Sequence, residues 1–281
     1  MPERVEDLSI SDIPDETIES IGAALNKFLL PIVKDFLWNG VRQKILAGSC
    51  TITTIDENMY LLTAGHVWNE LKDLDSIDFV LTEGTPSAFS IATKHIDSKI
   101  IWDACNPDTG PDLAILKIDA GSSSDIMAFK SSINLRQHRG SLFNVPAKIE
   151  KGLWAITGVV NEFTEVNIDE EHRISTIKLH GRALVGPSIA YDSNNGYDYI
   201  DISSNRNLPG VPANFGGVSG GGLWQINLRK TKDSRVVWDG RRYFRGVAFW
   251  QSSVVEGRRI VRCHGPKSLF SSAWSRWDFP V

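Results

Sequence analysis

Apolar residues recur at steps of three and four along residues 16–38, ETIESIGAALNKFLLPIVKDFLW. This spacing places them on one face of a helix, so the segment predicts an amphipathic α-helix. Pro31 lies inside the pattern and is expected to kink or split the helix, because proline lacks the N–H that a helix interior needs. The apolar face predicts packing on the domain, with a membrane or a partner as the alternative. It consists of Ile18, Ile21, Leu25, Phe28, Leu29, Ile32 and Phe36.

After Gly40 the pattern changes to short β-rich runs such as MYLLTAGHVW, DLAILKI and GGLWQINL, many of them separated by Asn, Asp and Gly. Such runs are typical of strands joined by tight turns. Strands do not alternate regularly with long helices, which disfavours a doubly wound α/β sheet. The sequence therefore predicts an all-β core of two barrels or sandwiches. The polar segment 121–141 is the expected seam between them.

Composition sets the class of protein. The chain has 281 residues, of which 42% are hydrophobic and 23% charged, as in globular proteins with one large or two small domains. Its formal net charge of -4 argues against a nucleic-acid or membrane-surface partner, since both usually attract a basic excess. No apolar stretch approaches the ~20 residues of a membrane span.

Cysteine and histidine usage narrows the chemistry further. Cys50, Cys105 and Cys263 are odd in number and form no CxxC pair, which fits a reducing compartment better than a disulfide framework. The six histidines lack zinc-ligand spacing. The polar, acidic N-terminus lacks the basic and apolar regions of a secretory signal. We expect a soluble cytoplasmic protein with neither metal nor organic cofactor.

The stretch NFGGVSGGGLWQ, residues 214–225, surrounds Ser219 with five glycines. A nucleophilic serine needs an exposed hydroxyl and nearby backbone N–H groups that stabilise the oxyanion of the attacked carbonyl. Glycine permits positive φ and close approach of a substrate. The pattern thus predicts a nucleophile loop in which Gly217 and Ser219 supply the oxyanion hole. An ordinary glycine-rich hairpin fits the same residues.

A serine nucleophile needs a base, and the base needs a group that orients it. His66, in YLLTAGHVW, follows an apolar strand and a turn of small residues, and is the best candidate base. Asp112, in GPDLAILKI, enters an apolar strand after a Gly-Pro turn and is the candidate acid. A structural histidine and a turn aspartate remain the alternatives for these two positions.

Together these three segments resemble the chymotrypsin-like (trypsin-fold) serine proteases, and among them stand-alone bacterial trypsin-like peptidases. LLTAGHV, DLAIL and GVSGGGLW match the family's histidine, aspartate and serine segments in order and approximate spacing over roughly residues 41–265. The resemblance implies two six-stranded antiparallel β-barrels with a His66–Asp112–Ser219 triad in the cleft between them. It implies a serine endopeptidase that acts on protein or peptide substrates through an acyl-enzyme.

The resemblance also implies a division of the chain. The first barrel would span about 41–120, a linker 121–145, the second barrel 146–265 and a C-terminal segment 266–281 of a protease domain covering 41–281. Residues 1–40 fall outside it as a helical extension. Because an active endopeptidase inside a cell must be restrained, this extension is a candidate regulatory segment that binds a partner through its apolar stripe.

Substrate-binding residues follow from the same resemblance. RGVAFWQSS resembles the family strand that pairs with the substrate backbone, so Phe249, Trp250 and Gln251 are expected to line the cleft. Ala213 occupies the specificity position six residues before the serine, where enzymes that cut after Lys or Arg carry an acid. His264 would lie behind the specificity pocket and contact an acidic or polar side chain.

The chain also departs from the family pattern. Val218 stands where secreted relatives carry the aspartate that pairs with a new N-terminus on activation, and Val67 replaces a disulfide cysteine.

Two other functions fit parts of the pattern. Residues 217–221 also match the G-x-S-x-G elbow of α/β-hydrolases, whose triad would be Ser219, Asp239 and His264, although strand–helix alternation is missing. A catalytically inactive protease-fold module that binds peptides or partners is the second alternative. It would keep the fold without bringing the three side chains within hydrogen-bond reach.

Overall fold

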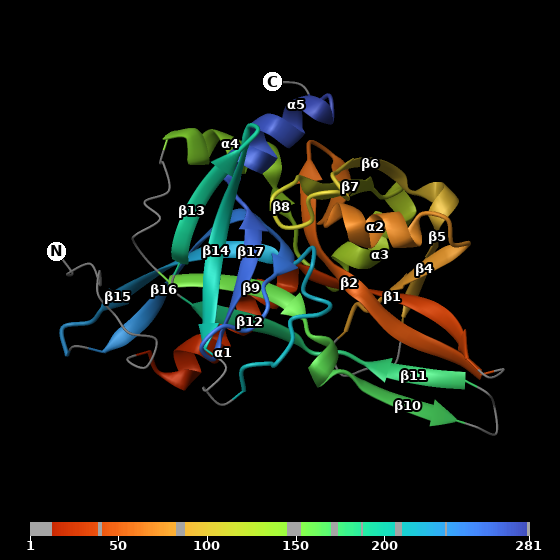
Figure 1. The fold of residues 1–281 in the computed structure, drawn as a ribbon, viewed down its shortest axis with the longest axis horizontal. Coiled ribbons are helices and arrows are strands. Elements are labelled where there is room, and N and C mark those ends of the chain that lie inside the picture. The colour runs from red at the N-terminus through yellow and green to blue at the C-terminus, as the bar shows by residue number, and fades with distance from the viewer. Residues whose placement is uncertain are drawn as a thin grey trace.

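The computed structural model describes residues 13–38, 41–82, 88–144, 153–169, 174–186, 188–205, 210–233 and 235–279. This part of the chain is mostly β-strand with few helices, and its strands form two sheets (Figure 1). The prediction of a β-rich core rather than an α/β sheet is therefore confirmed.

The first sheet has the strand order β5-β4-β1-β2-β3-β7-β6, with neighbours antiparallel. Its long central strand β2 also pairs in parallel with the short strands β8 and β11, and β10 forms a hairpin with β11. The strands are β1 (Leu29–Trp38), β2 (Val41–Ile55), β3 (Asn58–Thr63), β4 (Ser76–Phe79), β5 (Phe89–Ala92), β6 (Asp97–Trp102), β7 (Asp112–Lys117), β8 (Ile133–Asn134), β10 (Glu165–Asp169) and β11 (Ile174–Lys178).

The second sheet has the order β12-β9-β15-β16-β17-β14-β13 and is antiparallel throughout. The sheet curls, so that β12 at one end approaches β14 near the other end. The approach is close, since a Cβ added to Gly186 of β12 would lie 2.6 Å from the carbonyl oxygen of Ser203 of β14. The strands are β9 (Leu153–Val159), β12 (Gly181–Gly186), β13 (Ser188–Asn194), β14 (Tyr197–Asn205), β15 (Gly222–Lys230), β16 (Val236–Gln251) and β17 (Arg258–His264).

Helices lie around the two sheets. Residues 121–141, the expected seam, carry α3, β8 and α4 between the last long strand of the first sheet and β9 of the second. The helices are α1 (Asp15–Leu25), η2 (Asn26–Phe28), α2 (Gly65–Leu71), η3 (Thr93–His95), α3 (Ala120–Met127), α4 (Leu135–Asn144), η4 (Asn161–Phe163), η5 (Ser268–Ala273) and α5 (Trp274–Arg276).

The helix predicted over residues 16–38 is correct only as far as Leu25. Residues 29–38 form β1 instead, which pairs with β2 along its whole length. Residues Leu29, Leu30, Ile32 and Val33 are all buried, so both faces of the strand are apolar and the run also matches a helical period. Pro31 therefore lies in a strand, opposite Ser49, and does not kink a helix.

The apolar face of α1 is covered by the protein itself. Ile21 and Leu25 have no exposed surface, and the Phe28 ring lies 5.2 Å from the ring of Trp224 on β15. Asn26 donates a side-chain hydrogen bond to the Gly181 carbonyl of β12 at 3.0 Å. The helix is thus part of the core, and its buried stripe is not free to bind a regulatory partner as expected; residues 1–12 lie outside the described residues.

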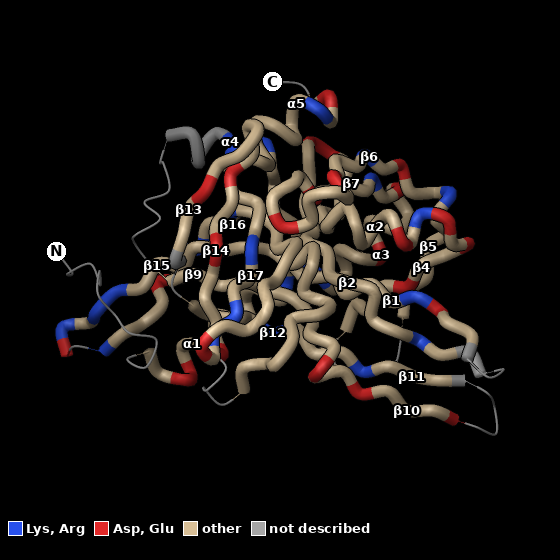
Figure 2. Tube along the Cα trace, in the orientation of Figure 1, with Lys and Arg blue, Asp and Glu red and all other residues tan. Residues whose placement is uncertain are grey.

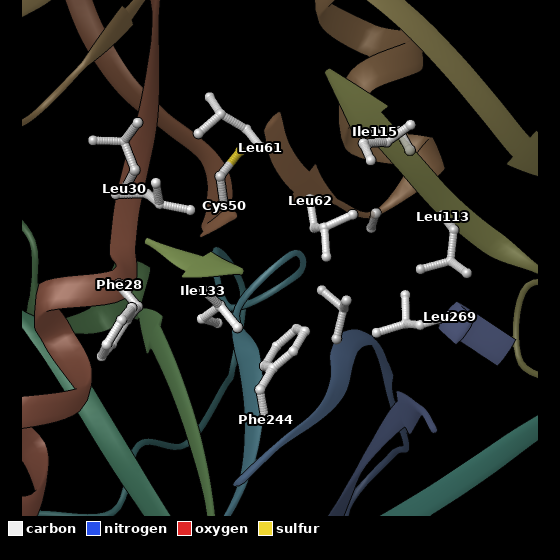
Figure 3. Packing of buried hydrophobic residues seen from close by; sticks show 14 of the residues in the cluster. Phe28, Leu30, Cys50, Leu61, Leu62, Leu113, Ile115, Ile133, Phe244 and Leu269 are labelled. Atoms are coloured by element: carbon white, nitrogen blue, oxygen red, sulfur yellow. The ribbon is translucent and has the colours of Figure 1, made fainter. Parts of the chain in front are cut away.

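One hydrophobic core joins the two sheets. Figure 3 shows Leu62 of β3 and Leu113 of β7 close to Phe244 of β16 and Leu269 of η5, and all four are buried in the same cluster. Core packing therefore fixes the position of the first sheet relative to the second.

Charged residues of both signs are interspersed around the outer parts of both sheets, as Figure 2 shows. Among the helices described, not one is long and apolar enough to cross a membrane.

Candidate active site

His66 stands where β3 leads into α2. Ala64 is the N-cap in extended conformation, and the helix begins at Gly65, so His66 is in its first turn. N–H groups in the first turn of a helix have no partner within the helix. The backbone N–H of His66 donates to Asp112 Oδ1 at 2.9 Å, and this bond ties the helix to the start of β7.

The imidazole and the same carboxylate form a second contact. His66 Nδ1 lies 2.6 Å from Asp112 Oδ2. A carboxylate can only accept, so Nδ1 carries the proton and Nε2 of the neutral ring is left as an acceptor. Asp112 is 6% exposed at its side chain and His66 35%, so the acid is buried and the base faces solvent.

Glycines near Ser219 are required by close packing against the first sheet. Gly217 and Gly220 both have φ of +92°, a conformation that side chains other than glycine rarely adopt. A Cβ on Gly220 would lie 1.9 Å from the Ser49 carbonyl oxygen of β2. Here the glycine-rich segment is therefore a tight loop pressed against the neighbouring sheet and not a flexible hairpin.

The N–H groups of Gly217 and Ser219 are available to a ligand. Residues 213–221 are all described, and every other N–H in this run donates to an acceptor in the protein. These acceptors are the side chains of Glu162, Gln251 and Asn214 and the carbonyls of Phe215, Ala248 and Val218. The two free donors are the two that the sequence predicts for an oxyanion hole.

Both free N–H donors belong to peptide groups whose carbonyl oxygens accept hydrogen bonds from other backbone N–H groups. The Gly216 carbonyl accepts from Asn161 N at 2.9 Å, and the Val218 carbonyl accepts from Gly221 N at 2.8 Å. Since a trans peptide is planar, its N–H points opposite to its carbonyl. Fixing these two carbonyls therefore fixes the directions of the Gly217 and Ser219 N–H groups, which is the preorganisation that oxyanion stabilisation requires.

Ser49 of β2 connects the glycine-rich loop around Ser219 to the first sheet, a role that was not predicted from the sequence. Its N–H donates to the Ser219 carbonyl at 2.9 Å, and its hydroxyl donates to the Gly217 carbonyl at 2.7 Å. The same hydroxyl oxygen accepts from Val159 N at 3.1 Å. Ser49 is fully buried, and its neighbours in sequence give no signal of this role, because its partners lie 110 and 168 residues away.

His66, Asp112 and Ser219 line one cleft of about 390 Å³. The rest of its wall includes Trp102 and Pro107 from the first half of the chain. The Ser219 hydroxyl is turned toward the Phe249 carbonyl oxygen, 3.4 Å away. In this rotamer Oγ makes no hydrogen bond to His66, although both residues are fully described.

Three of the five predicted substrate-binding residues line this cleft, namely Phe249, Trp250 and Gln251. Ala213 is not among the residues that line this cleft, and its backbone N–H donates to Glu162 Oε2 at 2.7 Å; its place in the specificity pocket stays a prediction. His264 is wrong as a pocket residue, because it has no exposed surface.

His264 lies behind the acid instead. Its Nε2 accepts from the backbone N–H of Asp112 at 3.0 Å, and its ring stacks on Phe249 at 4.3 Å. Burial lowers the pKa of His264 to about 3, because the interior cannot solvate an imidazolium. The residue is therefore neutral and links β17 of the second sheet to the start of β7.

Arg262 holds the loop that leads into Asp112. Its guanidinium makes two 2.8 Å hydrogen bonds to Asp201, and these raise the pKa of Arg262 above its ordinary value. Nη1 donates to the Asp108 carbonyl at 2.9 Å. The group also lies over the rings of Tyr199 and Trp250 at 5.8 and 5.9 Å. The loop wall of the cleft is thus attached to the second sheet.

The α/β-hydrolase triad does not form. His264 is bonded to Asp112, and Asp239 is bonded to Asn227 and Arg241 within β15 and β16. No group of three or more metal-ligating side chains occurs among the described residues. No protein-family model matches the chain, and no curated protein matches it either.

Proposed function

We propose that this protein is a serine endopeptidase in which the two sheets are the two β-barrels of a chymotrypsin-like fold. The observation that carries the proposal is the pair of free, fixed N–H groups of Gly217 and Ser219 in the cleft that also holds the His66–Asp112 pair. Acyl transfer needs hydrogen-bond donors that stabilise the developing negative charge and, beside them, a base whose imidazole is held in a fixed orientation.

In this mechanism the Ser219 hydroxyl rotates from Phe249 to His66 Nε2 when substrate binds, a change between staggered rotamers of χ1. Oγ attacks the scissile carbonyl while Nε2 takes its proton, and the oxyanion accepts from the Gly217 and Ser219 N–H groups. The C–N bond then breaks, and the leaving amine receives the proton from Nε2. Water, deprotonated by His66, hydrolyses the acyl-enzyme and regenerates Ser219.

Val218 explains why no new N-terminus is needed to form the loop. It is 1% exposed and packs in an apolar cluster with Phe215, Ile156 and their neighbours. A Cβ on Gly158 of β9 would lie only 3.0 Å from Val218, so the fit is close. Burial of an apolar side chain thus replaces the ion pair of activated secreted relatives, and we propose that the oxyanion hole is permanently formed.

A fluorophosphonate probe tests the proposal, because it reacts only with an activated serine. We expect stoichiometric labelling of Ser219 in the native protein and none in Ser219→Ala. In peptide hydrolysis the same variant should lose on the order of 10⁶-fold in turnover. Ser252→Ala is the control, since it removes a nearby serine that lies outside the cleft wall. Hydrolysis by Ser219→Ala at near the native rate would refute the assignment.

A second candidate is a peptide-binding module of the same fold without catalysis. It is favoured by one observation, that the Ser219 hydroxyl contacts the Phe249 carbonyl and not His66. If the probe leaves Ser219 unlabelled while peptides still bind the cleft, this function replaces the first.

A further inference from the structure

Gln251 joins two segments of the cleft wall near Ser219. The residue ends β16, and its side chain is hydrogen-bonded to the loop of residues 210–221. Oε1 accepts from the Phe215 backbone N–H at 2.9 Å, and Nε2 donates to Asn214 Oδ1 at 2.7 Å. Phe215 and Gln251 both line the cleft, so the amide forms a bridge between these two segments of its wall.

The direction of the bridge is fixed by its partners. Oε1 also accepts from Arg259 Nη1 at 2.7 Å, and Asn214 Oδ1 accepts from the Gly216 N–H at 2.8 Å. Because each amide oxygen faces N–H donors, neither side chain can flip without losing hydrogen bonds. Arg259 Nε is buried without a hydrogen-bond partner, whereas Nη1 of the same guanidinium donates to Gln251 Oε1.

We place the side chain of the attacked residue beside the bridge. If its carbonyl oxygen accepts from the Gly217 and Ser219 N–H groups, the acyl residue lies next to Ser219, and residues 215–218 and 248–251, which line the same cleft, are the walls that its side chain would meet. Val218, Ala248 and Val261 give this part of the cleft apolar walls.

We propose that Gln251 closes the specificity pocket, so that the enzyme cleaves after small residues, namely Gly, Ala and Ser. This inference rests on the proposed serine peptidase function. A larger side chain would have to displace the amide, break its hydrogen bonds to Phe215 and Asn214, and leave Arg259 without its acceptor. Lysine and arginine are disfavoured further, because the guanidinium of Arg259 contacts the bridge, and Asp112, the only carboxylate among the described residues that line the cleft, is already bonded to His66.

Paired covalent probes test the proposal. A fluorophosphonate without a peptide measures whether Ser219 is activated, and peptidyl diphenyl phosphonates with Ala or Phe at the reacting position measure which side chain fits. For the native protein we expect Ala to react at least about tenfold faster than Phe, the discrimination typical of one or more methylene groups in a tight pocket. Gln251→Gly should reverse the order, and Gln251→Leu, which fills the space without hydrogen bonds, should still exclude Phe.

The outcomes separate the two proposals. Fluorophosphonate labelling with equal Ala and Phe rates, or with faster reaction of an Asp or Glu phosphonate, overturns the inference and leaves the peptidase function standing. Labelling with an unchanged order in Gln251→Gly also overturns it. No fluorophosphonate labelling refutes the peptidase function, and the specificity proposal falls with it.

Discussion

Replacing Ser49 with alanine removes one hydroxyl group at the junction of the two sheets. Two partners lose their bonds, the Gly217 carbonyl at 2.7 Å and the Val159 N–H at 3.1 Å. The backbone bond from Ser49 N to the Ser219 carbonyl is unaffected. The substitution therefore loosens the positive-φ residue Gly217 specifically, while the loop stays attached through Ser219.

The size of the effect follows from these contacts. A buried polar group left without a partner costs about 1–3 kcal/mol, so two such groups should lower the free energy of unfolding by about 2–6 kcal/mol. Removal of an oxyanion donor costs about 10²–10³-fold in kcat. Because the Gly217 N–H is loosened and not removed, we expect a loss of roughly 10- to 100-fold in kcat with little change in KM.

Thr53→Val is the matched control. Thr53 lies on the same strand, is equally buried, and donates its hydroxyl to the Tyr60 carbonyl at 2.9 Å, away from the nucleophile loop. Urea unfolding measures the stability of both variants, and steady-state hydrolysis measures kcat. Both should be destabilised, but only Ser49→Ala should lose turnover. Equal turnover in the two variants would refute the role assigned to the Ser49 hydroxyl.

Two further predictions concern stability. His264 binds a proton near pH 6.5 in the unfolded chain but only near pH 3 when folded, so the native protein loses stability as pH falls from 6.5 toward 3, by about 2 kcal/mol at pH 5. Urea unfolding of His264→Gln should show a shallower decline over this range, and an identical decline would contradict the burial argument. Leu25→Ala should cost about 2–5 kcal/mol, since Leu25 is fully buried in the core, whereas half-buried Ile18→Ala should cost less. Similar losses for the two would mean that α1 is not held as described.

The sequence identified the three residues of the candidate site. A candidate nucleophile, base and acid can each be recognised from a few neighbouring residues, because a strand followed by a small turn or a glycine loop is a local feature. His66 and Asp112 do meet, and Ser219 does share their cleft. The β-rich class also follows from local patterns of apolar runs and turns.

Tertiary structure decided the features that depend on distant partners. Residues 29–38 match a helical period, yet they form β1 because β2 supplies hydrogen bonds along the strand and both faces are buried. Neighbouring residues alone do not predict such pairing. The same holds for α1, because its apolar face would also suit a partner protein, and only the structure shows that β12 and β16 pack against the helix.

For His264 and Ser49, too, the structural role depends on contacts with residues far away in the sequence. His264 could be assigned to a pocket by position, but its hydrogen bond to Asp112, 152 residues away, places it in the interior. Ser49 gave no functional pattern, since its importance comes from contacts with Gly217 and Val159. Local sequence determines which candidate groups are present, whereas packing between the two sheets determines which of them meet and which N–H groups remain free.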